Sequence, residues 1–234
     1  MNLFDSEIKE VLKLIENQNI RELSLTDDLL KDLGKNNMIF SNESAYELGS
    51  DNDSVSFDLS SSNSELINKD QIILIGKDLN EITVNSMFSR ISLVEVIDDE
   101  IKGDELYDRL EKIKFTKYRV SPEGYMLRTA SGNKEKVRVS KELQKTGSFS
   151  KIGSAYIKAY KQMPFVKHVT EIFITGDNDI FKKLKDIGIK KTNITEAVDH
   201  ILKGMVANDC GSCSVKDLCD EVEGMREIHK GGTK

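Results

Sequence analysis

The sequence predicts an α+β protein in which helices pack on a mixed β-sheet. Three observations point to this class. The N-terminal residues repeat apolar side chains at helical spacing, Gln71–Gly76 encloses a continuous apolar run, and helix-like and strand-like stretches then alternate without an internal repeat. Residues 38–206 are expected to form one globular domain, with residues 1–37 and 207–234 attached at its two ends.

Residues 1–37 are expected to form a helical appendage. Within Asn2–Asn17, apolar side chains recur every three or four positions, which is typical of an amphipathic helix. Leu25–Leu33 predicts a second short helix, with Thr26 as its N-cap and Gly34 after its end. Two interpretations of this pair stay open: the helices cover one edge of the core domain, or they form a hairpin that binds a partner.

Short strands are expected in the first half of the domain. Met38–Phe40 and Ser54–Leu59 have the composition of half-buried strands. Gln71–Gly76 predicts a central strand buried on both faces, because its apolar side chains occupy both sides and a glycine ends it. Phe88–Ile97 predicts a further strand.

Helices and strands are also expected in the second half. The pattern predicts a helix over Asp104–Lys114, short strands at Tyr118–Val120 and Val137–Val139, a helix that Ser150 caps and that stops before Pro164, and a strand over Val166–Thr175. Apolar residues from Phe181 to Ile187 and from Val198 to Met205 predict two further helices.

Composition restricts the class of protein. Of the 234 residues, 38% are hydrophobic and 32% are charged, which is usual for a globular domain in water. No apolar stretch approaches the roughly 18 residues of a membrane helix, and the N-terminus lacks the basic and apolar regions of a signal peptide. We therefore expect a cytoplasmic protein without a membrane partner.

All three cysteines lie within ten positions, at Cys210, Cys213 and Cys219. In a reducing compartment, such a cluster indicates metal ligands or a redox pair more than disulfides. Two cysteines separated by two residues can direct both sulfur atoms at one centre, and the third adds a third ligand. His229 is the most metal-like candidate for a fourth ligand. Zinc and an iron–sulfur cluster both stay open, and three ordinary thiols are the alternative.

Several segments resemble a known family in their order along the chain. They are Tyr46–Gly49 through Phe57–Leu59, Ile72–Leu79, Arg138–Lys141, and Gly153–Phe165 followed by Ile172–Thr175. Together they resemble the domain that precedes the active-site cluster of acetyl-CoA synthase, the β subunit of the CO dehydrogenase/acetyl-CoA synthase complex. The resemblance covers about residues 38–219.

In that family, the cysteines after this domain hold a [4Fe–4S] cubane bridged to two nickel ions. The resemblance matches Cys210 and Cys213 to the family's first Cys-x-x-Cys pair, and Cys219 to the next ligand. A fourth cysteine and the nickel-chelating Cys-Gly-Cys motif are both missing from the sequence. The resemblance therefore implies a partial [4Fe–4S] site in a non-acetylating accessory protein of anaerobic one-carbon or corrinoid metabolism. A corrinoid protein or a redox partner protein is the partner it implies.

Residues 112–167 are strongly basic, although the net charge of the chain is −6. The resemblance implies coenzyme A as a ligand, whose phosphates suit such a tract, and Arg138, Lys141 and Lys158 are the candidate residues. A solvated basic face is the alternative. Nucleic acid is not expected, because the chain is acidic overall and has no recognised nucleic-acid motif. His168 and His200 are expected to be ordinary boundary residues.

Overall fold

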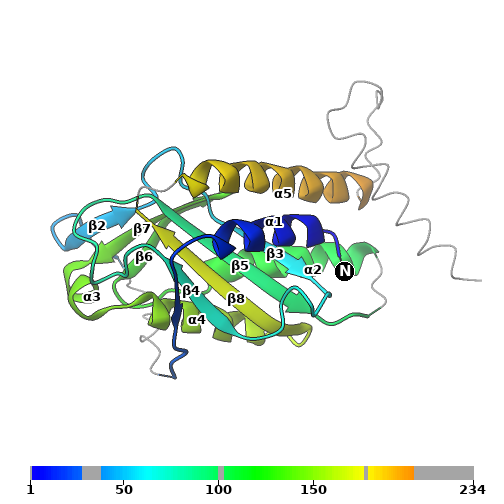
Figure 1. Cartoon of the computed structure of the whole chain (residues 1–234), viewed down its shortest axis with the longest axis horizontal. Coiled ribbons are helices and arrows are strands. Elements are labelled where there is room, and N and C mark those ends of the chain that lie inside the picture. The colour runs from blue at the N-terminus through cyan, green and yellow to red at the C-terminus, as the bar shows by residue number, and fades with distance from the viewer. Residues whose placement is uncertain (1, 28–37, 100–102, 177–178, 203–234) are drawn as a thin grey trace, which may run out of the picture.

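The computed structural model describes residues 2–27, 38–99, 103–176 and 179–202 (Figure 1). In chain order, the elements are α1 (Asp5–Glu16), β1 (Ile20–Leu23), β2 (Ser44–Leu48), β3 (Phe57–Ser61), β4 (Gln71–Ile75), β5 (Phe88–Val96), α2 (Gly103–Phe115), the 3₁₀ helix η1 (Thr116–Tyr118), β6 (Tyr125–Ser131), β7 (Lys134–Ser140), α3 (Lys141–Thr146), α4 (Phe149–Lys161), β8 (Val166–Thr175) and α5 (Ile180–Leu202).

The larger sheet has five strands in the order β1-β4-β8-β5-β3. The β4–β8 and β3–β5 pairs are parallel, whereas the β1–β4 and β5–β8 pairs are antiparallel. The sheet is therefore mixed, and the expected α+β class is confirmed. Gln71–Gly76 supplies β4, an interior strand whose apolar residues are buried, and β8 rather than β4 lies at the centre.

The smaller sheet is antiparallel, with strand order β2-β7-β6. The turn at Gly132 and Asn133 joins β6 to β7, and Gly132 has a positive φ of 55°. This sheet packs against the larger one through buried residues such as Leu48, Val137 and Val139. Its register carries polar side chains of β7 into the space between the two sheets.

The helices α1, α2 and α5 cover one face of the larger sheet, and the smaller sheet together with α4 covers the other. On one face, α1 and α5 lie side by side and α2 packs beside them (Figure 1). Their buried residues join those of β3, β4, β5 and β8 in one hydrophobic cluster. On the other face, α4 and the smaller sheet form a second cluster with β4, β5 and β8. The larger sheet is thus shared by two cores.

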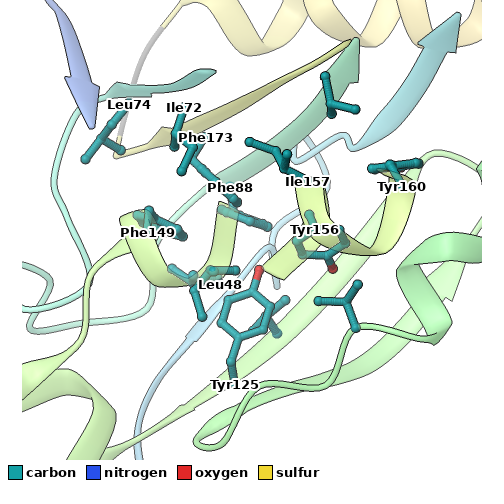
Figure 2. Packing of buried hydrophobic residues seen from close by; sticks show 14 of the residues in the cluster. Leu48, Ile72, Leu74, Phe88, Tyr125, Phe149, Tyr156, Ile157, Tyr160 and Phe173 are labelled. Carbon is teal, nitrogen blue, oxygen red and sulfur yellow. The ribbon is translucent and has the colours of Figure 1, made fainter. Parts of the chain in front are cut away.

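Aromatic packing fixes α4 on the sheet. The Phe149 ring stacks on the Phe173 ring of β8 with 4.5 Å between centroids, and on the Phe88 ring of β5 at 6.0 Å (Figure 2). Gly153 allows the close approach, because a Cβ at this position would lie 2.8 Å from two carbon atoms of the Ile72 side chain. Gly153 therefore serves helix–sheet packing.

The N-terminal residues belong to the same packing units as the rest of the described chain. The expected first helix is confirmed as α1, which buries Ile8, Val11 and Ile15 in the same cluster as the sheet residues, together with Phe4 at its N-cap. After it, β1 pairs with β4 as an edge strand, which helical periodicity did not predict. In the described chain, α1 therefore packs on a face of the larger sheet, and β1 forms one edge of it. The expected helix Leu25–Leu33 lies mostly outside the described residues.

Three local predictions were wrong for physical reasons. Tyr118–Val120 is a 3₁₀ turn and loop that continues from α2, and the strand of this region is β6 instead. Met38–Phe40 forms no strand, since Ile39 alone is buried among them. Ser148, not Ser150, caps α4: its hydroxyl accepts a hydrogen bond from the Ser150 amide.

The two helices expected near the end of the domain form one continuous helix, α5. Residues 188–197 lie between the two apolar segments that the prediction assigned to separate helices. The helix continues because Ile187, Ile194 and Val198 stay on its buried face, while Thr192 and Thr195 donate to carbonyls one turn earlier. Asn133 also donates to the Gly188 carbonyl and to Thr192, which ties α5 to the β6–β7 turn.

Candidate functional site

The predicted metal ligands Cys210, Cys213, Cys219 and His229 lie outside the described residues. The last described residue, Leu202, ends α5 and precedes Cys210 by eight positions. Within the ranges that the structure describes, no group of three or more His, Cys, Asp and Glu side chains is placed to hold a metal ion. The metal prediction therefore stays a prediction about the C-terminal segment.

Arg138 lies on β7 and is occupied by neighbours in the fold. Its Nε and Nη2 donate to Glu47 Oε1 on β2 at 3.0 and 2.8 Å, and its Nη1 donates to the Ile39 carbonyl at 2.7 Å. Arg128 pairs with the same carboxylate. The Arg138 and Arg128 guanidinium groups lower the pKa of Glu47 against the opposing effect of burial. A phosphate at Arg138 would have to displace Glu47.

Lys141 and Lys158, the other two candidates for coenzyme A, lie on different elements. Lys141 begins α3, and its Nζ donates to the Asn42 carbonyl at 2.7 Å. Lys158 is exposed in the last turn of α4. Two of the three predicted cations are therefore committed to the segment between residues 39 and 47.

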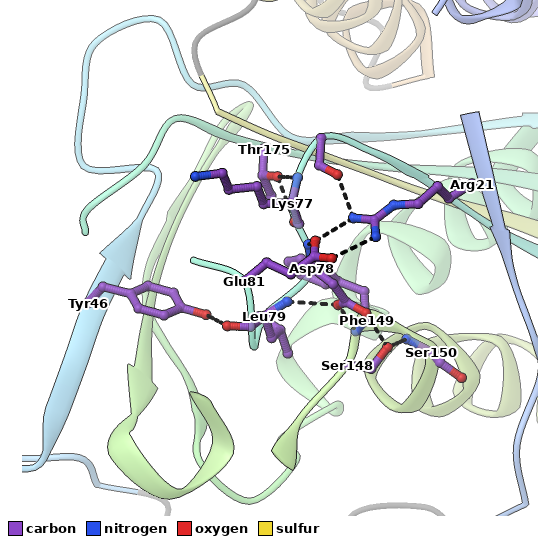
Figure 3. Close-up of polar contacts among 11 residues, drawn as sticks. Arg21, Tyr46, Lys77, Asp78, Leu79, Glu81, Ser148, Phe149, Ser150 and Thr175 are labelled. Carbon is purple, nitrogen blue, oxygen red and sulfur yellow. Dashed lines mark hydrogen bonds and ion pairs between the residues drawn. The ribbon is translucent and has the colours of Figure 1, made fainter. Parts of the chain in front are cut away.

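A polar site missed in the sequence lies where the parallel strands β4 and β8 end. Their carboxyl ends share one edge of the sheet, which is a common ligand position in α/β sheets. Gly76 follows β4 at φ 96°, and a Cβ there would lie 2.2 Å from the Thr175 carbonyl oxygen. Thr175 Oγ1 then accepts from the Lys77 amide at 2.8 Å and donates to the Lys77 carbonyl at 2.7 Å, which fixes the loop (Figure 3).

This loop places Asp78 at the N-terminus of α4. Asp78 Oδ1 accepts from the Phe149 amide at 2.7 Å, and Oδ2 accepts from the Ser148 hydroxyl at 2.6 Å (Figure 3). The carboxylate therefore occupies the position where a helix N-terminus would otherwise attract an anion. A phosphate group would have to compete with a carboxylate of the protein itself.

Glu81 in the same loop forms a bidentate pair with Arg21 of β1, at 3.0 and 2.7 Å. Glu81 also accepts from the Asp78 amide. The Arg21 hydrogen bonds, followed by that of the Asp78 amide, lower the pKa of Glu81 to about 2. The loop is thus bound to both β1 and α4, and its charges are internally balanced.

A buried polar layer lies between the two sheets and was also missed. Arg90 of β5 is completely buried, and its Nε donates to Glu135 Oε2 of β7 at 2.9 Å while Nη2 contacts Glu135 Oε1. Its Nη1 donates to the Ser92 hydroxyl, and its guanidinium lies 4.3 Å from the centre of the Tyr156 ring of α4. This bidentate pair crosses the interface between the sheets.

Glu171 of β8 faces the same layer without comparable partners. Its side chain is fully buried, its Oε2 is 3.6 Å from Arg90 Nη1, and neither oxygen accepts a hydrogen bond from the described residues. Burial raises the pKa of Glu171 to about 8, against the opposing effect of Arg90. The Tyr156 and Tyr160 hydroxyls of α4 are likewise buried without a hydrogen-bond partner in the described part of the chain (Figure 2).

Two lysines border this layer near the edge strand β3. Lys191 of α5 lies 3.7 Å from Asp58 Oδ2, and both side chains are largely buried. Lys117 of η1 is 4% exposed, and burial lowers the pKa of its ammonium group. A cavity of about 10 Å³ beside Asp58 and Ser60 is large enough for about one water molecule.

Sequence reasoning missed the buried layer because its members come from distant positions. Arg90, Glu135 and Glu171 each lie inside an apolar strand pattern, and a charged residue in a strand otherwise buried on both faces is the signal that could have revealed them. His168, expected to be a boundary residue, is 40% exposed beside Asp70 and Glu95. His200 belongs to α5.

Comparison of the sequence with protein-family models gives no match, and comparison with curated proteins gives none either. None of the helices in the described ranges has both the length and the apolar content needed to cross a bilayer. The candidate sites are therefore judged from their own chemistry.

Proposed function

We propose that the protein binds an iron–sulfur cluster through Cys210, Cys213 and Cys219, and that its α+β domain carries this site to a partner protein. The observation that carries the proposal is the spacing of the cysteines, which places all three within ten positions. Thiolates at such spacing are the usual ligands of iron–sulfur clusters and of zinc. His229 is the candidate fourth ligand.

The architecture of the described domain supports a carrier role. Both faces of the larger sheet are covered by hydrophobic cores, and α5, which belongs to one of them, ends eight residues before Cys210 in the sequence. Eight residues separate the end of α5 from Cys210, so Cys210 is within about 29 Å of Leu202 even in a fully extended chain. A metal site there would stay close to a rigid domain.

The partner class follows from the resemblance to acetyl-CoA synthase. We propose an accessory protein of anaerobic one-carbon or corrinoid metabolism in the cytoplasm, which docks a corrinoid protein or a redox partner. Coenzyme A is less favoured as a ligand, because Arg138 and Lys141 already bind neighbouring segments. A nickel-based synthesis of acetyl-CoA is not proposed, since the sequence has no Cys-Gly-Cys motif.

Anaerobic metal analysis of the full chain tests the proposal. We expect iron and sulfide near four per chain, with an absorption band in the visible region that bleaches on reduction. Substituting serine for Cys210, Cys213 or Cys219 should lower the iron content and remove the band. Ser214→Ala is the matched control, because it changes a neighbour that cannot act as a thiolate ligand.

Each outcome discriminates between the alternatives. A colourless protein with one zinc per chain would indicate a zinc-stapled module and not an iron–sulfur protein. Protein purified and reconstituted without oxygen that holds neither metal would overturn the proposal. His229→Ala should reduce cluster occupancy if the histidine is the fourth ligand, and leave it unchanged if a partner supplies that ligand.

A further inference from the structure

The charges in contact with Glu171 do not balance if Arg90, Glu135 and Glu171 are all ionised. Arg90 lies between two carboxylates, Glu135 and Glu171, and its guanidinium is bidentate to Glu135. A single cation cannot neutralise both. A carboxylate taken out of water without close hydrogen bonds is strongly disfavoured, and Arg90 Nη1, which donates to Ser92, lies 3.6 Å from Glu171 Oε2.

The groups facing Glu171 come from every element packed around it. They are Arg90 and Ser92 of β5, Glu135 of β7, Tyr125 of β6, and Tyr156 and Tyr160 of α4. Lys117 of η1 lies at the border of this group, where it interacts with Glu135, Arg90 and Asp58 of β3. Lys191 pairs with Asp58 at the border. Lys117 has no ion-pair partner within 4.0 Å among the described residues, and burial lowers its pKa.

If all six acidic and basic groups of this layer were ionised, their charges would also sum to zero, but Glu171 would then share Arg90 with Glu135, and Lys117 would have no carboxylate within 4.0 Å among the described residues. If Glu171 keeps its proton and Lys117 loses its own, the remaining charges form two pairs, Arg90 with Glu135 and Lys191 with Asp58. The first pair joins β5 of the larger sheet to β7 of the smaller one. An ionised Glu171 would compete with Glu135 for Arg90 and weaken this link.

We propose that Glu171 is protonated in the folded domain, and that loss of this proton loosens the packing of α4 and the smaller sheet on the larger sheet. The contact between the two sheets through this buried layer therefore depends on the protonation of Glu171. This role is independent of the metal site, because none of its groups is a candidate ligand. It makes the rigidity of the domain respond to alkaline pH.

The direction of the pH effect follows from linkage. The folded-state pKa of Glu171, about 8, is higher than that of an exposed glutamate. The stabilisation is therefore complete below the unfolded pKa near 4.5 and is lost as pH rises through the folded value. Between about pH 5 and 8, this single group should raise the unfolding equilibrium constant by about tenfold for each pH unit.

Urea unfolding of the full chain at intervals from pH 5 to 8 tests whether Glu171 makes the stability depend on pH. We expect the wild type to lose stability over this range and Glu171→Gln to lose much less, because glutamine cannot ionise. Glu22→Gln is the matched control: Glu22 is an exposed glutamate paired with Lys69, so its variant should keep the wild-type slope. Lys117 is present in all three proteins, so its own titration contributes to the pH dependence of each of them.

Two further measurements keep the proposal open to refutation if Glu171→Gln folds poorly. The carboxyl carbon of Glu171 in the wild type should titrate above pH 7 by NMR, and hydrogen-exchange protection of β6, β7 and α4 should fall over the same range. Titration near pH 4.5 would overturn the proposal. An unchanged pH slope in a folded Glu171→Gln variant would do the same.

Discussion

The charged side chains of this domain differ in their burial and in the contacts that fix them. Arg90 is fully buried and bidentate to Glu135, whereas Arg138 is partly buried between β2 and the Ile39 carbonyl, and Lys158 is exposed. All three belong to long apolar or basic stretches of the sequence, where they look alike. Their surroundings decide whether each stabilises the fold or is free to meet a ligand.

Arg138 and Lys158 therefore predict opposite results in an alanine comparison. Arg138→Ala leaves Glu47 without its stronger partner and frees the Ile39 carbonyl, so we expect the free energy of unfolding to fall by about 1–3 kcal/mol. Lys158→Ala removes an exposed side chain and should change it by less than about 0.5 kcal/mol. Urea unfolding at pH 7 measures both. Equal losses would show that Arg138 is not held as described.

Individual elements could be predicted where one periodicity dominates. The strands β5 and β8 and the helix α1 carry their apolar pattern over nearly their whole length, so the residue types alone located them. The strand β6 was missed because Tyr125 and Leu127 face the core with a register shift before Thr129, which breaks the period of two. The sequence predicted two helices in place of α5, because the middle of α5 is held by Asn133, which lies in a distant turn.

The contact between α4 and β4 predicts a substitution whose effect contradicts helix propensity. Gly153→Ala should destabilise the protein by about 1–3 kcal/mol, although alanine favours helices by about 1 kcal/mol over glycine. The reason is that the new Cβ would lie 2.8–3.0 Å from three atoms of Ile72, so the whole side chain must move. Ile72→Val in the same chain should recover part of the loss. Thermal unfolding of the two variants measures the effect, and a stabilising Gly153→Ala would contradict the packing.

The candidate sites became visible only in the whole molecule. Asp78 and Phe149 are 71 positions apart, and Arg90 and Glu135 are 45 apart, yet each pair is joined by hydrogen bonds. No local pattern encodes such contacts, because strand order determines them. The cysteine cluster differs, because its spacing is local and the sequence alone predicts a metal site there. Metal analysis is the test of that prediction.

At the largest scale, the two hydrophobic cores share one sheet and consist of residues between Phe4 and Val198. Because the described elements pack into these two cores, we expect a chain ending at Leu202 to fold and to unfold in one transition, and we expect the same of the full chain. Its unfolding midpoint in urea should lie near that of the metal-free full chain, while iron binding is lost. A full chain in which serine replaces all three cysteines is the control, since it separates loss of the metal from loss of the segment. Failure of the shorter chain to fold would mean that residues 203–234 complete a core.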